Sequence, residues 1–186
     1  MSNQAEKATY DTHENNPDDL GYRKFLSRPV NALLDKLALN KTNKTEQRGL
    51  DFGCGPGPTL SVMMQEAGYQ MANYDIYYFA EESLLQQQYD FITCTEAIEH
   101  FNTPAKEWQL LLDLLKPEGY LVIMTKLVID QTAFANWHYK NDQTHVSFFS
   151  RATFNWLATQ NQLKVDFVGK DVIIFQKGKS TENKVN

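Results

Sequence analysis

The sequence has few cysteines, few basic residues and no long apolar run. Cys54 and Cys94 are the two cysteines, and their spacing is not C-x-x-C. This excludes a disulfide-rich scaffold and predicts reduced thiols. Lys and Arg number 18 against 23 Asp and Glu, a net charge of −5, which argues against broad nucleic-acid binding. No window reaches ~18 uninterrupted apolar residues and the N-terminus has no apolar leader core, so we expect a cytoplasmic protein without a membrane span.

The length of 186 residues suits a single domain. Residues 1–19 are polar and acidic, and we expect them to be mobile unless a ligand or the body of the protein orders them. The domain itself is predicted to span 20–177, with 126–148 as a lid or substrate insert. The polar residues 178–186 are expected to form a disordered tail.

Apolar patterning alternates between strand and helix periods along the domain. Pro29 is expected to break or restart the first helix near its first turn. Such alternation predicts an α/β fold, a doubly wound and mostly parallel sheet that ends in an antiparallel hairpin. We predict strands at 49–52, 69–75, 89–95, 120–125, 163–168 and 172–176, and helices at 20–39, 59–67, 108–115 and 149–161.

A glycine loop, LDFGCGPGP at 50–58, is the strongest motif. It follows a predicted strand and precedes a predicted helix, where bare backbone and unpaired N–H groups can receive a ligand. The dinucleotide pattern G-x-G-x-x-G fails, because Pro58 stands where the third glycine belongs. Asp51 beside the loop instead suits a ligand with a cationic amine, such as the methionine part of S-adenosylmethionine. Asp75 ends the second strand, where a carboxylate can reach a ribose diol. A simple strand-to-helix turn is the alternative.

The sequence resembles the class I S-adenosylmethionine-dependent methyltransferases, in particular bacterial members related to the ubiquinone-biosynthesis methylases. The resemblance covers roughly 45–177 and rests on LDFGCGPG, YQMANYDIYY, YDFITCTEAIEHF and LLKPEGYLVIMT. It implies a Rossmann-like methyltransferase fold that binds S-adenosylmethionine. The residues that it places at the cofactor are Asp51, Gly53, Cys54, Gly55, Gly57, Asp75, Ile76, Thr95 and Glu96.

One region departs from the family pattern. Only residues 76–89 separate the second strand from YDFITCT, where the family has a helix, a third strand and a turn. We therefore predict that the third strand is reduced or missing. Because that strand usually reads the adenine, its place could be filled by Ile76, Tyr77 or Leu84.

An E-x-x-E-H run follows the next strand. If it opens as a helical turn, Glu96, Glu99 and His100 project toward one side. With His145 they could hold Mg²⁺ or Mn²⁺. The run resembles that of metal-assisted O-methyltransferases of quinone biosynthesis and of small-RNA 3′-terminal ribose methylation. An acidic helix start without any metal is the alternative.

The predicted insert carries further candidates. His145 can be read as a general base on an accepting hydroxyl or as a structural histidine. Trp137 and Tyr139 precede it and are either substrate-side residues or packing aromatics.

These patterns predict an S-adenosylmethionine-dependent methyltransferase that acts on a small-molecule acceptor at oxygen. His145, His100 and Glu96 are the candidate catalytic residues. Two alternatives stay open: a metal-assisted RNA ribose O-methyltransferase and a non-catalytic S-adenosylmethionine-binding module. Pro58 and Asp51 argue against a nicotinamide dehydrogenase.

Overall fold

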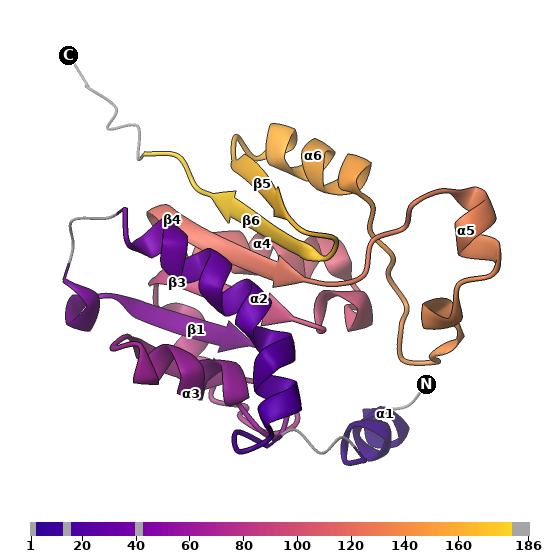
Figure 1. The fold of residues 1–186 in the computed structure, drawn as a ribbon, viewed down its shortest axis with the longest axis horizontal. Coiled ribbons are helices and arrows are strands. Elements are labelled where there is room, and N and C mark those ends of the chain that lie inside the picture. Colours follow the sequence, from indigo (N-terminus) through magenta and orange to yellow (C-terminus); the bar gives the residue numbers. More distant parts are fainter. Residues whose placement is uncertain (1–2, 13–15, 40–42, 180–186) are drawn as a thin grey trace.

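The fold is a six-stranded sheet covered by helices on both faces (Figure 1). The computed structural model describes residues 3–12, 16–39 and 43–179. The strand order is β2-β1-β3-β4-β6-β5, with parallel pairing from β2 to β4 and antiparallel pairing of β4 with β6 and β6 with β5. The strands are β1 Arg48–Phe52, β2 Gln70–Tyr74, β3 Tyr89–Thr95, β4 Leu115–Met124, β5 Lys164–Val168 and β6 Val172–Gln176. The predicted doubly wound sheet with its C-terminal hairpin is confirmed.

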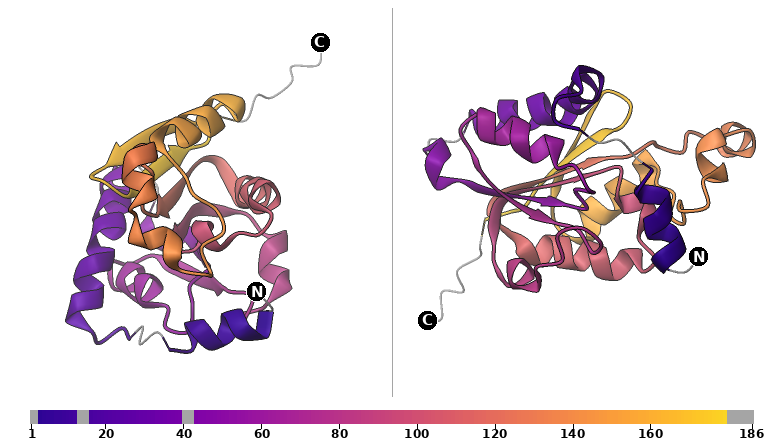
Figure 2. Two further views of the ribbon diagram at one scale, coloured as in Figure 1. Left: turned by 90° about the vertical axis from the view of Figure 1, so that its right-hand side faces the viewer. Right: turned by 90° about the horizontal axis from the view of Figure 1, so that it is seen from below.

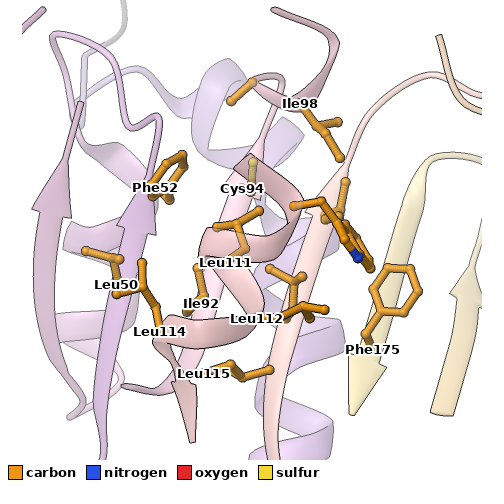
Figure 3. Close-up of a cluster of buried hydrophobic side chains, with 14 of the residues drawn as sticks. Leu50, Phe52, Ile92, Cys94, Ile98, Leu111, Leu112, Leu114, Leu115 and Phe175 are labelled. Carbon is orange, nitrogen blue, oxygen red and sulfur yellow. The ribbon is translucent and has the colours of Figure 1, made fainter. Parts of the chain in front are cut away.

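Each face of the sheet has its own helices and its own core. The α-helices are α1 Asn3–Tyr10, α2 Leu20–Leu37, α3 Thr59–Glu66, α4 Pro104–Leu114, α5 Gln131–Ala135 and α6 Arg151–Gln160. Leu33 of α2 and Met64 of α3 pack with Phe91 on one face. On the other face, Leu111 of α4 packs with residues of β1, β3 and β6 (Figure 3). Both layers are closely packed apolar clusters, so the sheet is a rigid platform for the loops at its ends.

Helix α2 passes through Pro29 without a break, so the expected break is wrong. Proline has no N–H, which would leave the carbonyl of Phe25 without its helical partner. The Nε of Arg28 donates to that carbonyl at 3.2 Å. The buried ring of Pro29 lies among the apolar residues of the inner face, and Asp19 caps the helix start by accepting from the N–H groups of Gly21 and Tyr22.

No third strand of the kind the family has lies between β2 and β3 in the described residues. After β2, Asp75 forms an isolated bridge with Phe79, and the 3-10 helix Glu82–Gln86 follows. Strand β2 is therefore an edge of the sheet. This confirms the predicted loss of the third strand, since so short a connection cannot hold a strand and its crossover helix.

Two segments lie at the carboxyl ends of the parallel strands: helix α1 and the insert at 126–148 (Figure 2). The insert holds α5 and the 3-10 helix His138–Asn141. Helix α1 falls within the segment that we expected to be mobile unless a ligand or the body of the protein orders it, and it contacts the turn after β2 through Glu6. Of the expected disordered tail, 180–186 lies outside the described residues. No helix in the described ranges is long and apolar enough to cross a bilayer.

Candidate active site

The carboxyl ends of β1, β2 and β3 open into one cavity of about 540 Å³. Helix α1, the start of α2 and the insert complete its walls. The cavity is lined by Asp51, Gly53, Cys54, Gly55, Gly57, Asp75, Ile76, Thr95, Glu96, His100 and His145, which we predicted at the cofactor or in catalysis. Glu99, predicted as a metal ligand, lines it as well. Two further candidates do not line it: Leu84 is buried in the core instead, and Trp137 lies outside the lining.

The glycine loop offers bare backbone to the cavity. Gly53 and Gly55 have φ of +74° and +64°, which favours glycine. The N–H of Gly53 donates to the carbonyl of Tyr74 at 2.8 Å, which ties the loop to the end of β2. A Cβ at position 53 would lie 2.6 Å from the Cβ of Ala97, so no side chain fits there. The loop is therefore held close to both neighbouring strand ends.

Asp75 joins the glycine loop to the turn after β2. One carboxylate oxygen accepts from the N–H of Gly55 at 3.0 Å. The other accepts from the N–H groups of Tyr77 and Tyr78 at 2.8 and 3.3 Å. A carboxylate has about four lone-pair sites, so Asp75 can still accept from sugar hydroxyls.

Asp51 is a buried carboxyl beneath the loop, 2% exposed. The hydroxyl of Thr93 donates to it at 2.8 Å. Burial raises the pKa of Asp51 to about 7 despite this hydrogen bond. A cationic ligand group nearby would favour the ionised form, which is the pairing that we predicted for the cofactor amine.

Glu99, His100 and His145 form a second cluster in the same cavity. One potential ligand atom from each lies within 4.8 Å of the others. The rings of His100 and His145 meet edge to face at 4.8 Å. Glu99 is 1% exposed and its Oε2 has no hydrogen-bond partner in the described structure. A buried carboxylate oxygen without a partner needs a proton donor or a cation.

The backbone of the insert orients both imidazoles. The Nδ1 of His100 lies 3.0 Å from the carbonyl of Thr144, and the Nδ1 of His145 lies 2.7 Å from the carbonyl of Tyr139. Because a carbonyl only accepts, each Nδ1 donates a proton, so the lone pair of the neutral form of each ring is on Nε2. Nε2 of His145 lies 3.8 Å from a carboxylate oxygen of Asp142. Burial lowers the pKa of His100, which favours the neutral ring. Both histidines can thus accept a proton or bind a metal.

Glu96 lies apart from this cluster. Its backbone is left-handed at φ +48°, and its N–H donates to the carbonyl of Met124 at 2.8 Å. Only the 3-10 helix Ile98–His100 forms in the E-x-x-E-H run, so Glu96 does not share a helical face with Glu99. Burial raises the pKa of Glu96 to about 8. The assumed helical turn over the whole run is wrong, and Glu96 is not one of the three clustered residues.

Helix α1, from the polar N-terminal segment, also lines the cavity through Glu6 and Tyr10. Glu6 is buried and accepts from the hydroxyls of Tyr10 and Tyr77 at 2.8 and 3.2 Å. The Tyr10 ring contacts His100 edge to face at 5.3 Å. Glu6 and Tyr10 are four residues apart, a spacing that places both on one helix face, but nothing in that spacing indicates what the face would cover.

Comparison with known proteins agrees with this geometry. A family model described as "Methyltransferase domain" matches residues 22–167. A ubiquinone biosynthesis O-methyltransferase of Shewanella pealeana is 31% identical over 77 residues. That match covers 41% of this chain and only 33% of the relative's length.

Solved methyltransferase structures share the fold. The magnesium protoporphyrin IX methyltransferase of Synechocystis PCC 6803, with bound S-adenosylhomocysteine, has a TM-score of 0.59 at 15% identity, over 80% of this chain and 82% of that one. An S-adenosylmethionine-dependent methyltransferase of Archaeoglobus fulgidus has a TM-score of 0.55 at 19% identity, over 80% and 93%. Since the family model spans most of the sequence, the chain belongs to the methyltransferase-domain family, and it shares the Rossmann-like fold of these solved methyltransferases.

Proposed function

We propose that this protein transfers a methyl group from S-adenosylmethionine to a small-molecule acceptor, at an oxygen atom. The observation that carries this proposal is that a glycine loop with two acidic partners and a buried carboxylate–imidazole cluster open into one cavity. The first group suits the cofactor and the second suits an accepting hydroxyl.

In this proposal the cofactor lies along the strand ends. Asp51 and the backbone at Gly53, Gly55 and Gly57 would hold the methionine part, with Cys54 packing inside the loop. Asp75 would accept from the ribose hydroxyls, and Ile76 would flank the adenine. Thr95 and Glu96 at the end of β3 would face the sulfonium.

The reaction needs little beyond alignment and removal of a proton. The acceptor oxygen attacks the methyl carbon, the bond from carbon to sulfur breaks, and S-adenosylhomocysteine leaves as a neutral thioether. The hydroxyl proton passes to a base in the cavity. His145 and His100 are candidates through Nε2, since their Nδ1 protons are held by backbone carbonyls. Glu96 is the third candidate and can take the proton only when it is ionised, near or above its pKa of about 8.

A divalent cation is part of the proposal. Glu99, His100 and His145 offer one carboxylate and two imidazoles, and Oε2 of Glu99 is buried without a partner. This donor set fits Mn²⁺ better than the Mg²⁺ that we also predicted, because Mg²⁺ prefers oxygen ligands. Such an ion would lower the pKa of a bound hydroxyl. Glu96 remains a proposed ligand only if it moves toward the other three.

The cavity lining favours a small molecule over RNA. Among the described residues no Lys or Arg lines it, whereas Glu6, Glu96, Glu99 and Asp142 do. A phosphate backbone would meet carboxylates there without a basic partner. Among the solved relatives, the plantazolicin methyltransferase (TM-score 0.55, 16% identity) was crystallised with a desmethyl substrate analogue, which agrees with a non-nucleic-acid acceptor.

Calorimetry with S-adenosylhomocysteine tests the cofactor site. Asp75→Ala should weaken binding about tenfold or more, because it removes the proposed sugar contact, the N–H contact of Gly55 in the loop and the two N–H contacts of the turn after β2. Gly55→Leu should abolish binding, because its φ of +64° and its place against the ligand exclude a side chain. Asp113→Ala on the exposed side of α4 is the matched control.

Unchanged affinity in both site variants would contradict the assigned cofactor site. Release of S-adenosylhomocysteine in the presence of hydroxylated acceptors tests catalysis separately. Tight cofactor binding without turnover on hydroxyl, amine or thiol acceptors would favour the non-catalytic binding module.

A further inference from the structure

Tyr139 connects two members of the Glu99–His100–His145 cluster. It lies in the 3-10 helix His138–Asn141 of the insert and is 6% exposed. Its hydroxyl donates to Oε1 of Glu99, and its carbonyl accepts from Nδ1 of His145 at 2.7 Å. The rings of Tyr139 and His145 are 4.0 Å apart. One residue thus contacts the carboxylate through its side chain and the imidazole through its backbone.

The hydroxyl of Tyr139 determines how the carboxylate of Glu99 is turned. Oε2 has no partner in the described structure, so the hydrogen bond to Oε1 is the contact that holds the carboxylate plane. The terminal torsion of Glu is broad, so without that contact the carboxylate could rotate. The Tyr139 hydroxyl also lies 3.4 Å from Oγ1 of Thr125. The Tyr139 ring lies under Lys126, whose Nζ is 4.8 Å from the ring centre.

We propose that Tyr139 is a positioning residue that aims Oε2 of Glu99 at a divalent cation shared with His100 and His145. This inference rests on the metal site of the proposed function. Hydrogen-bond partners of metal ligands fix their orientation, and losing one typically lowers metal affinity about 10–100-fold.

The test is a titration of the whole chain with Co²⁺, in which the visible absorption of the bound ion reports binding. Tyr139→Phe removes the hydroxyl and keeps both the ring and the carbonyl that orients His145. We expect its Co²⁺ affinity to fall about tenfold or more, with an altered spectrum. Tyr120→Phe is the matched control, because it removes an equally buried tyrosine hydroxyl, which accepts from Nε2 of Gln176, and Tyr120 is not among the described residues that line the cavity. Its Co²⁺ affinity should equal that of the unaltered protein.

A double-variant cycle separates positioning from general damage to the fold. In a Glu99→Gln background, Tyr139→Phe should lower Co²⁺ affinity by less than about twofold, since the residue acts through Glu99. An undiminished loss in that background, or equal affinities of Tyr139→Phe and the unaltered protein, would overturn the inference.

S-adenosylhomocysteine binding, measured on the same samples, distinguishes the two levels of the proposal. Absence of Co²⁺ binding by the unaltered protein with normal S-adenosylhomocysteine binding would overturn the role of Tyr139 and leave methyl transfer standing. Absence of S-adenosylhomocysteine binding would contradict the proposed function itself.

Discussion

At the scale of single residues, two carboxyl groups, the buried Asp51 and the half-buried Glu96, have pKa values raised into the neutral range. Burial raises the pKa of Asp51 to about 7 and that of Glu96 to about 8. In the unfolded chain both groups ionise near pH 4. Between about pH 4 and the folded-state pKa of each group, the folded protein keeps a proton that the unfolded chain has released. The free energy of unfolding must therefore fall as the pH rises through this window, by up to about 1.4 kcal/mol per pH unit for each group.

We predict that Asp51→Asn flattens this pH dependence. Asparagine cannot ionise, so the slope between pH 5 and pH 7 should become shallower by about 1 kcal/mol per pH unit. Urea unfolding of the ligand-free protein at several pH values measures the slope of the free energy of unfolding against pH. Asp113→Asn, which alters an exposed carboxylate, should keep the original slope. Parallel slopes for the unaltered protein and Asp51→Asn would show that Asp51 is ionised throughout.

At the scale of elements, the glycine loop depends on a close approach between two strand ends. Position 53 combines a left-handed backbone with a Cβ that would lie 2.6 Å from Ala97. Gly169, in the turn between β5 and β6, has a similar φ of +64°, but a Cβ at this position would have no neighbouring atom within 4 Å. A side chain at either position would therefore meet the same unfavourable left-handed backbone, but only a side chain at position 53 would also clash with a neighbouring residue.

We predict that Gly53→Ala destabilises the protein more than Gly169→Ala. The backbone cost of alanine in the left-handed region is about 1–2 kcal/mol at either position. Gly53→Ala should add about 1–3 kcal/mol, because the loop or the Ala97 segment must move. It should also weaken S-adenosylhomocysteine binding, which Gly169→Ala should not. Chemical unfolding and calorimetry measure both effects, and equal losses of stability would contradict the close contact.

The elements that the sequence predicts best are those with strong periodicity and clear boundaries. Strand β3 has the predicted bounds, and Ser150 caps α6 with Thr153 in a capping box. The break at Pro29 is wrong, because the side chain of Arg28 satisfies the carbonyl that proline frees. Local propensity could not reveal this, since the compensation comes from a side-chain conformation.

The candidate site likewise has a part that the sequence predicts and a part that it does not. The glycine loop and Asp75 follow from strand ends that a parallel sheet must bring together. The pairing of Glu99 with Tyr139, and the contact of Tyr10 with His100, join segments more than 30 residues apart in sequence through an insert and an N-terminal helix. No periodicity encodes such contacts, because they depend on how irregular segments fold over the sheet.

At the scale of the whole molecule, the short connection that stands in place of a third strand also contacts helix α1. The short connection after β2 presents the hydroxyls of Tyr77 and Tyr78 toward α1, where they donate to Glu6 and Asp11 at 3.2 and 2.7 Å. Lys7 lies over the Tyr78 ring, with its Nζ 4.7 Å from the ring centre. The segment that replaces the strand therefore holds the helix that closes one side of the cavity.

The charge distribution of the molecule leads to the last prediction, which concerns RNA. Several basic side chains are already paired with carboxylates: Arg23 with Glu66, Arg28 with Asp171, Lys36 with Asp166 and Lys116 with Asp90. With a net charge of −5 and no Lys or Arg among the described residues of the cavity wall, a phosphate backbone would meet no basic partner at the site.

We therefore expect no binding of a short labelled single-stranded RNA tighter than about 10⁻⁴ M, the weak end of non-specific affinity. Fluorescence anisotropy at low and high salt measures it, with S-adenosylhomocysteine binding in the same samples as the control for native protein. Contacts to phosphate release counterions, so an RNA affinity that falls steeply with salt would reveal a basic surface that the described residues do not show. Methyl transfer to the terminal ribose of that RNA would then replace the small-molecule acceptor in the proposed function.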